Sequence, residues 1–473
     1  MRAAGTDPFP ARFPDREEIA SARATAESLR PGDTRPGAVR IAGRLAARRG
    51  QGKMAFLDLR DGSGQMQLWA RADEIGAEAL AGLTSLDLGD FVGAWGQLAR
   101  TKRGELSLMV EGWQLLAKSL RPPPDKHAGV RDPETRYRQR YLDLMADEGQ
   151  RATFVSRSKA ISAIRRFLED RGFVEVETPV LQPIYGGAAA RPFVTHHNAI
   201  SRDLYLRIAP ELYLKRCIVG GLDKVFELGR VFRNEGVSAK HNPEFTALET
   251  YEAYADYEDV MQMLEQMVAQ AATAVTGATS VTRDGVEIDL SPPWRRVPLR
   301  EAINEATGID IGQARARDAL AGQMQAQGYT APEGADWAHL VDDLLSQGLE
   351  PTLVQPTFLV DYPVELSPFA KRTEADPELV ERFEAYVAGM EIANAFTELN
   401  DPDDQRARMA DLAAARASGD DEAQPEDEDF LIALEHGMPP TGGLGVGIDR
   451  LVMILANRPS IREVVLFPAL RTS

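Results

Sequence analysis

The first quarter of the chain alternates apolar and polar residues over short stretches, as half-buried β-strands do. Turns are marked by Arg49-Gly50 and by residues 61–64 and 102–104. One helical stretch, at residues 72–83, follows the third strand candidate. Five strands with a helix between the third and fourth is the order of an OB-fold barrel. We therefore predict an OB-fold over residues 1–120, with strands in VRIAGRLAA, KMAFLDLRD, GQMQLWA, DFVGAWGQLA and ELSLMVEGWQLL.

The remainder of the chain mixes helical and strand patterns. Three prolines at 122–124 favour an extended chain, so residues 121–145 are interpreted as a linker. Apolar residues recur at helical spacing from Phe154 to Leu168, and many strand candidates with short turns follow. For residues 146–473 this predicts an α+β domain, in which helices flank a mostly antiparallel sheet. A helical insertion is expected at about 270–355, and a solvated acidic loop at 419–429.

Composition narrows the class of protein. Hydrophobic residues make up 44% and charged residues 27%, an ordinary globular mix. The single cysteine, Cys217, excludes an internal disulfide and a Cys-based zinc cluster. The first residues contain no apolar signal segment, and we find no apolar run of about 18 residues that would span a membrane. We expect a soluble cytoplasmic protein.

The net charge of −18 argues at first against a nucleic-acid partner, because such partners need cations to neutralise phosphates. The charge is unevenly distributed, however. Residues 35–145 contain 18 Lys and Arg against 13 Asp and Glu. A basic N-terminal part can hold a polyanion locally, although random variation along the chain explains this excess equally well. Charge therefore permits an RNA partner without establishing one.

Three separated segments carry the strongest chemical signal. The first is a helix and strand at roughly residues 156–179, followed by GGAAARPF; the second is VFRNE, a loop and HNPEF; the third is GLGVGIDR. In order and separation they resemble the three signature motifs of class II aminoacyl-tRNA synthetases. Further segments resemble the bacterial-type lysyl subgroup, nearly over the whole chain, rather than its aspartyl or asparaginyl relatives: TRYRQRYLDLM, THHNA, LYLRIAPELYLKR and ALEHGMPPT.

This resemblance implies a lysine–tRNA ligase. Such an enzyme activates lysine with ATP to lysyl-adenylate, releases pyrophosphate and transfers lysine to the 3′ end of tRNA(Lys). The chemistry depends on positioning and charge neutralisation rather than on a protein nucleophile. The resemblance gives catalytic roles to Arg233, which bridges the carboxylate and the α-phosphate, and to Arg450, which lies on adenine and reaches the γ-phosphate. The other ATP contacts that it implies are Glu235, His241, Phe245 and Glu384.

Magnesium takes oxygen ligands, and the resemblance assigns Glu384 and Glu391 to it. A turn at Ala388-Gly389 predicts a hairpin that places these carboxylates diagonally on one face. Under strict alternation, three further site residues would lie on the face opposite Glu391. We therefore expect a bulge near residues 392–393 that returns them to the same face: Asn394, Phe396 and Glu398.

A lysine pocket needs acidic groups for two ammonium ions and an apolar channel between them. By resemblance, Gly187, Glu211 and Glu249 hold the α-amino end, and Asn394 assists the carboxylate. Tyr251 and Glu398 receive the ε-ammonium, and Phe396 is a wall. An aspartate pocket would need a cation at the position of Glu398, because an unpaired buried carboxylate is costly. The acidic lining argues against an aspartyl or asparaginyl enzyme.

The barrel is expected to bind the anticodon, because OB-folds stack single-stranded bases on aromatic side chains in a basic groove. Arg48, Arg49, Phe56 and Gln67 match the family's base-stacking and base-reading positions. Without the motif, Phe56 would be interpreted as a core residue.

The resemblance also implies a homodimer joined through the first motif. Two rival functions are weighed against this one. An enzyme that lysylates a protein would lack the anticodon-binding barrel. A non-catalytic nucleic-acid-binding or regulatory protein would lack the ATP contacts, which are all present here.

Overall fold

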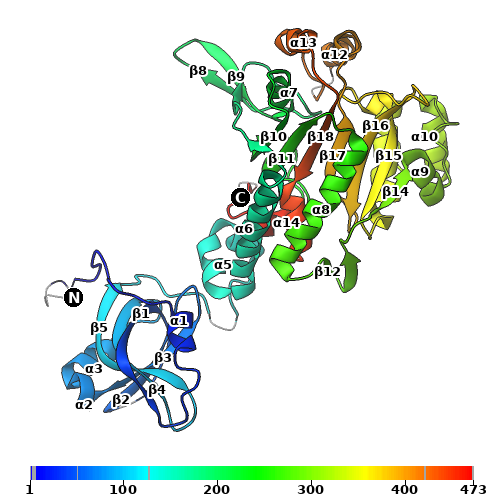
Figure 1. Ribbon diagram of the computed structural model, residues 1–473. Helices are drawn as coiled ribbons and strands as arrows, with labels where there is room; N and C mark the ends of the chain where they lie inside the picture. The colour runs from blue at the N-terminus through cyan, green and yellow to red at the C-terminus, as the bar shows by residue number, and fades with distance from the viewer. Residues whose placement is uncertain (1, 3–6, 51, 126–127, 420–421, 471–473) are drawn as a thin grey trace. The chain divides into compact units, whose positions relative to one another are not determined.

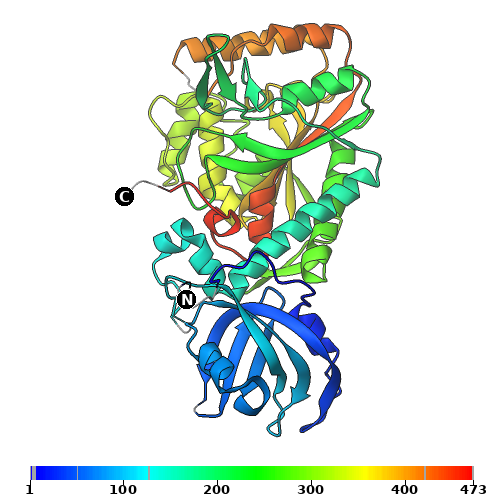
Figure 2. The same cartoon turned by 90° about the vertical axis from the view of Figure 1, so that its left-hand side faces the viewer.

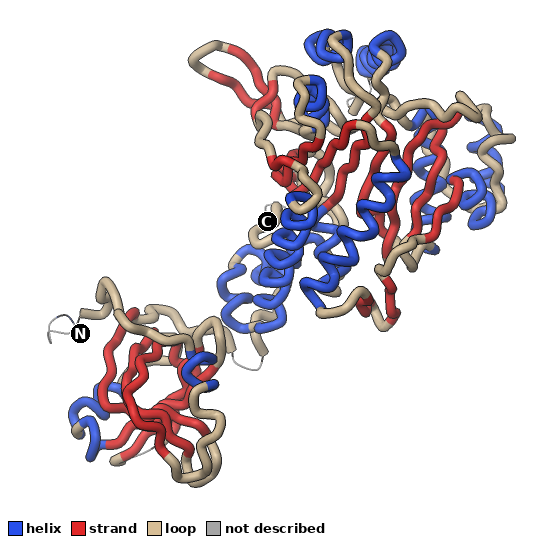
Figure 3. Tube along the Cα trace, in the orientation of Figure 1, coloured by secondary structure: helices blue, strands red, loops and turns tan. Residues whose placement is uncertain are grey.

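The computed structural model describes residues 2, 7–50, 52–125, 128–419 and 422–470. The chain forms two compact units, Met1–Arg131 and Asp132–Ser473, which we call the N-terminal and C-terminal units. Strands dominate the N-terminal unit, and the longer helices belong to the C-terminal unit (Figure 3). No helix in the described part of the chain is long and apolar enough to cross a membrane.

The N-terminal unit is a closed five-stranded barrel (Figure 2) with the order β1-β2-β3-β5-β4. The predicted helical stretch lies between the third and fourth strands as two helices, which Gly76 separates with a φ of 85°. The prediction of an OB-fold barrel is confirmed. A short helix, α1 (Ile19–Ala24), precedes the barrel and was not predicted. The bounds are β1 (Thr34–Arg49), β2 (Met54–Arg60), β3 (Gln65–Arg71), α2 (Ala72–Ile75), α3 (Ala77–Thr84), β4 (Phe91–Arg100) and β5 (Leu106–Ala117).

The C-terminal unit is built on an eight-stranded sheet with the order β14-β15-β16-β17-β18-β11-β10-β6 (Figure 1). Its neighbours are antiparallel except for the two outer pairs, β14–β15 and β10–β6. The predicted antiparallel-rich α+β architecture is confirmed. The strands are β6 (Val174–Glu175), β10 (Lys224–Phe232), β11 (Glu244–Ala253), β14 (Arg295–Pro298), β15 (Thr357–Pro363), β16 (Leu379–Val387), β17 (Met390–Thr397) and β18 (Thr441–Gly447).

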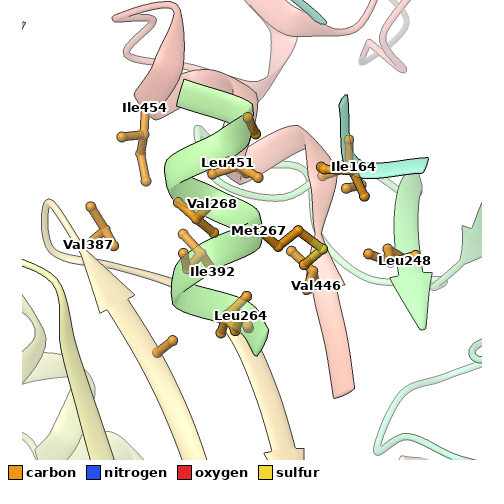
Figure 4. Packing of buried hydrophobic residues seen from close by; sticks show 14 of the residues in the cluster. Ile164, Leu248, Leu264, Met267, Val268, Val387, Ile392, Val446, Leu451 and Ile454 are labelled. Atoms are coloured by element: carbon orange, nitrogen blue, oxygen red, sulfur yellow. The ribbon is translucent and has the colours of Figure 1, made fainter. Parts of the chain in front are cut away.

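Three helices cover one face of this sheet and form the main core with it: α6 (Glu148–Glu169), α8 (Tyr257–Thr276) and α14 (Ile448–Leu455). Figure 4 shows Leu264, Met267 and Val268 of α8 packed among residues of the central strands, including Ile392 and Val446. The opposite face of the central strands is therefore left for polar side chains.

Smaller elements complete the C-terminal unit. A three-stranded sheet has the order β7-β9-β8, and β12 pairs with β13 in a hairpin. Helix α7 contacts β10 and β11, and α12 contacts α13. The bounds are β7 (Leu181–Gln182), β8 (Val194–His197), β9 (Arg202–Leu206), α7 (Glu211–Val219), β12 (Ser280–Arg283), β13 (Val286–Asp289), α12 (Pro402–Ala417), α13 (Glu428–Glu435) and α15 (Ile461–Val464).

The segment predicted as a helical insertion contains three helices beside the β14–β15 edge (Figure 1). These are α9 (Leu299–Thr307), α10 (Arg317–Ala326) and α11 (Trp337–Leu344), and they share a second core with the strands β14, β15 and β16. The segment is not separate from the main fold, because β14 lies within the predicted range and joins the main sheet.

The second half of the predicted linker is helical and belongs to the C-terminal unit. It forms α4 (Pro133–Arg138) and α5 (Arg140–Ala146). Asp132 accepts a hydrogen bond from the Thr135 amide and Pro133 opens the helix, a strong start signal that the proline run at 122–124 obscured. Arg140 is fully buried and donates to the carbonyls of Leu466 and Val465, which fixes α5 to the C-terminal end of the unit.

Replacing Leu264 by alanine tests the core. The side chain is fully buried between α8 and the sheet, so we expect Leu264→Ala to lower the free energy of unfolding by about 2–5 kcal/mol. Leu222→Ala is the matched control, because Leu222 is 43% exposed and its loss should cost less than about 0.5 kcal/mol. Urea unfolding of both variants measures this, and similar losses would contradict the assignment of the core.

Candidate active site

The hairpin of β16 and β17 organises the site. Val387 pairs with Met390 across a turn in which Ala388 and Gly389 have φ values of 54° and 67°. Two consecutive positive φ values are typical of the tight turn that closes twisted hairpins, so the predicted turn is confirmed. The tip is held from outside, because the amides of Ala388 and Gly389 donate to the carbonyls of Val354 and Leu353 at 2.9 Å.

The predicted bulge is present at Ile392. Ala385 pairs with Ala393, whereas the next residue of β16, Tyr386, pairs with Glu391, so Ile392 has no partner in the ladder. Ile392 and Ala393 both enter the core. The bulge thus returns the later residues of β17 to the face of Glu391, and that face carries Glu384, Glu391, Asn394 and Phe396.

Glu384 is held by three donors. The hydroxyls of Tyr362 and Tyr386 donate to one carboxylate oxygen at 2.9 and 2.6 Å, and Arg382 donates to the other at 2.6 Å. Arg382 also donates to the Asn394 side chain at 3.1 Å, so it orients two of the predicted site residues. The sequence analysis missed Arg382, because an arginine in a strand gives no signal of its own.

Negative charge accumulates around this carboxylate. Asp342, on α11, keeps access to solvent, but desolvation by the surrounding protein, followed by the charge of Glu384, raises the pKa of Asp342 to about 7. Burial likewise raises the pKa of Glu350, with contributions from Glu391 and Glu384. Both residues come from the helical segment beside β15, which therefore adds acidic groups around the site.

A hydrogen-bonded chain links the second and third motifs to β17. Arg450 donates to Glu391 at 2.8 Å and to Nε2 of His241 at 3.1 Å, and Nδ1 of His241 lies 2.8 Å from the Ser238 hydroxyl. Burial and the adjacent Arg450 lower the pKa of His241, so the ring is neutral near pH 7. A neutral ring that accepts from Arg450 at Nε2 donates from Nδ1 to Ser238.

Arg233 lies beside the same region. Its guanidinium sits over the Phe245 ring, 5.2 Å from the centroid, and its Nε is buried without a hydrogen-bond partner among the described residues. Burial lowers the pKa of Arg233, while the nearby carboxylate of Glu235 raises it. A half-buried guanidinium with an unused Nε donor is suited to bind an anion.

A second cluster consists of buried acidic side chains around β11, where the resemblance predicts the lysine pocket. Burial, and then the charge of Glu211, raise the pKa of Glu249 well above its usual value, and Tyr251 donates to Glu249 at 3.2 Å. Glu398 is fully buried. Burial raises the pKa of Glu398 to about 8, although Lys215 acts in the opposite direction. The sequence analysis missed Lys215, a fully buried lysine that forms ion pairs with both Glu211 and Glu398.

Two glycines are required by close contacts in this pocket. Gly187 has a φ of 86°, and a Cβ there would lie 2.7 Å from Cβ of Glu211. At Gly443, a Cβ would overlap Oε1 of Glu398 and lie 2.7 Å from the Tyr251 ring. The sequence analysis had assigned Gly187 to the pocket but not Gly443.

The expectation that residues 419–429 form only a solvated acidic loop is wrong. Residues 420–421 lie outside the described residues, but Gln424 is buried, accepts from the Gly187 amide at 2.8 Å and donates to the Ala188 carbonyl at 2.9 Å. Asp427 is buried as well and forms an ion pair with Arg216. In the sequence, the surrounding acidic residues made Gln424 and Asp427 look solvent-exposed, so neither contact was predicted.

The barrel carries a groove of about 1390 Å³. Phe56 and Gln67 line it, together with Arg49, which forms an ion pair with Asp58. The Phe56 ring stacks on Trp69, with centroids 6.3 Å apart, and is not part of the barrel core. Arg48 is not among the lining residues; its guanidinium instead donates to the Leu86 carbonyl at 2.9 Å. Neighbouring residues of a strand point to opposite faces, which separates Arg48 from Arg49.

Comparison with known proteins agrees with the division of the chain into an N-terminal and a C-terminal unit. The family model described as "tRNA synthetases class II (D, K and N)" matches residues 132–471, and the "OB-fold nucleic acid binding domain" matches residues 39–116. The chain belongs to the class II tRNA synthetases of the D, K and N group.

Similar proteins indicate which member of the D, K and N group the chain resembles. A protein of Chloroflexus aurantiacus named Lysine--tRNA ligase is 52% identical over 100% of this chain and 96% of its own length. Proteins of the same name from Dehalococcoides mccartyi and Synechococcus sp. are each 51% identical over 100% of this chain and 95% and 96% of their lengths. Within the class, the chain is a member of the lysine–tRNA ligase family.

A methyl group at position 443 tests the packing of the pocket. Because a Cβ there overlaps Glu398, we expect Gly443→Ala to destabilise the C-terminal unit by about 1–3 kcal/mol. Gly445→Ala is the control, since its Cβ would find its nearest neighbour at 3.7 Å, an ordinary contact. Equal urea midpoints for the two variants would show that Glu398 does not occupy this position.

Proposed function

We propose that the protein activates lysine with ATP to lysyl-adenylate, releases pyrophosphate and transfers the lysine to the 3′ end of tRNA(Lys). The observation that carries this proposal is the acidic pocket of Glu211, Glu249, Tyr251 and Glu398 beside two arginines suited to phosphate. The acidic cluster matches the two ammonium groups of lysine. The two arginines match the negatively charged phosphates of ATP.

In the first step the lysine carboxylate attacks the α-phosphorus and pyrophosphate leaves. Arg233 neutralises the carboxylate and the α-phosphate, since its unused donor lies at the junction of the two clusters. Arg450 and His241 bind the γ-phosphate, and Phe245 stacks on adenine, with Glu235 contacting its edge. Asn394, fixed by Arg382, assists the carboxylate of lysine, and Phe396 lines the channel. In the second step a ribose hydroxyl of tRNA attacks the carbonyl and AMP leaves.

Glu384 and Glu391 fit a magnesium site. They offer hard oxygen donors diagonally on one sheet face, which is the kind of ligand that this ion takes. Bound Mg²⁺ would neutralise phosphate charge. Such an ion would complete its ligand shell with phosphate oxygens of ATP and with water.

A homodimer and a cytoplasmic location complete the proposal. Apolar side chains are exposed along and beside the first motif, and a partner subunit would cover them: Val155, Val174, Val180 and Leu181. Their exposure at the first motif is the observation that supports a second copy of the chain at this place.

The direct test is ATP–pyrophosphate exchange with each of the twenty amino acids, in the presence of magnesium and without tRNA. Exchange with lysine alone is expected, followed by charging of tRNA(Lys). Exchange with aspartate or asparagine would overturn the pocket assignment while keeping the fold. Absence of exchange from folded protein would favour a non-catalytic role, and charging of a protein instead of tRNA would favour the protein-modifying alternative.

Phe56→Ala tests the proposed anticodon groove, in which Arg49 and Gln67 read the bases. Stacking of a base on an aromatic ring is worth about 1–3 kcal/mol, so the KM for tRNA should rise about 5- to 150-fold. Lysine-dependent exchange without tRNA should be unchanged. Phe91→Ala is the control, because Phe91 is an exposed barrel aromatic outside the groove. Loss of both activities in Phe56→Ala would indicate a folding role instead.

A further inference from the structure

Lys215 places a positive charge inside the acidic pocket. It lies on α7, one turn after Glu211, and its side chain is fully buried. Its ammonium donates to Oε1 of Glu211 at 2.7 Å and forms an ion pair with Oε2 of Glu398. Burial acts to lower the pKa of Lys215, but these two carboxylates raise it above its usual value. The residue is therefore charged.

Aromatic rings complete the enclosure of this ammonium. Phe369, Phe396 and Phe430 have their centroids 5.0, 5.9 and 6.0 Å from Nζ. Carboxylates with aromatic faces form the environment that best stabilises a buried ammonium. A substrate amine that reaches Glu398 would thus meet a site that already holds one cation.

The two oxygens of Glu398 are not equivalent. Oε2 faces Lys215, whereas Oε1 lies against Gly443 and Tyr251. Among the described residues, Oε2 has Lys215 as its ion-pair partner and Oε1 has no hydrogen-bond partner. Oε1, buried and without any partner there, is the oxygen left for a ligand.

We propose that Lys215 is a positioning residue for lysine recognition: it binds Oε2 of Glu398 and favours the charged form of this carboxylate, so that Oε1 is presented to the ε-ammonium of the substrate. This inference rests on the proposed function. Among the described residues, the charged or titratable groups that interact with Glu398 and Lys215 are Glu211 on α7 and Tyr251 on β11, and Tyr251 in turn interacts with Glu249. Of the groups that act on the pKa of Glu398, only Lys215 lowers it.

The sign of the pH effect follows from this balance. Glu398 binds an ammonium only when it is deprotonated, so lysine binding should improve as the pH rises through about 8. Without the cation at position 215, deprotonation requires a still higher pH. A neutral residue at position 215 should therefore weaken lysine binding most near neutral pH and less at alkaline pH.

The experiment measures the KM for lysine in ATP–pyrophosphate exchange from pH 6.5 to 9 with Lys215→Met, Lys215→Arg and wild-type enzyme. We expect Lys215→Met to raise the KM about tenfold or more at pH 7.5, equivalent to a pKa shift of one unit, with the KM for ATP nearly unchanged. The KM for lysine of Lys215→Met, divided by that of the wild-type enzyme, should fall towards pH 9. Lys215→Arg, which keeps the charge, should restore most of the affinity and the wild-type pH profile.

Lys224→Met is the matched control. Lys224 forms an ion pair with Glu252 and lies 5.6 Å from the Phe173 centroid, but it is outside the pocket, so its loss should leave the KM for lysine unchanged. A ratio for Lys215→Met that is the same at every pH, or an equal defect in Lys215→Arg, would overturn the proposal. Should Lys215→Met not fold, Lys215→Gln is the neutral variant. Absence of lysine exchange from wild-type protein would instead refute the proposed function.

Discussion

The unpaired residue Ile392 in β17 determines which side chains of the central sheet face the core and which face the site. A strand that alternated without interruption would send either Glu391 or Asn394 into the hydrophobic layer under α8 and α14. Because Ile392 and Ala393 both point into that layer, the polar residues on either side of them share the opposite face. One extra residue thus keeps an apolar core and a charged site on the two sides of the same strand.

The carboxylates on the site face of the sheet are stabilised by hydrogen bonds and ion pairs rather than by contact with solvent. Glu384 receives three hydrogen bonds, Glu391 is bound by Arg450, and Glu398 contacts Lys215. Burying such groups costs free energy that pairing only partly offsets, so these pairs contribute little to folding. Their consequence is preorganisation: the side chains are held in position before any ligand arrives. The unused donor of Arg233 and the unused oxygen of Glu398 are the places where this pairing is incomplete.

Much of the fold and site could be predicted because the relevant signals are local. Strand alternation and the turn at Ala388-Gly389 indicate the hairpin, and the conflict between alternation and the motif residues indicates the bulge. Lys215 and Gln424 escaped prediction because their roles arise from contacts with distant parts of the chain: a lysine on a helix and a glutamine in an acidic run look solvated in the sequence. The helix starting at Pro133 had a local signal, but the neighbouring prolines were given more weight.

The amides at the hairpin tip have a consequence for protein engineering. Ala388 has a left-handed conformation that costs an L-residue about 1 kcal/mol, and the tip is fastened by the carbonyls of Leu353 and Val354 at the end of the helical segment. A truncated chain without residues 299–355 would lose this attachment together with most of the core that the three helices share with β15 and β16. Excision of the segment would therefore free the hairpin that carries Glu384 and Glu391, and a minimal catalytic fragment has to retain it.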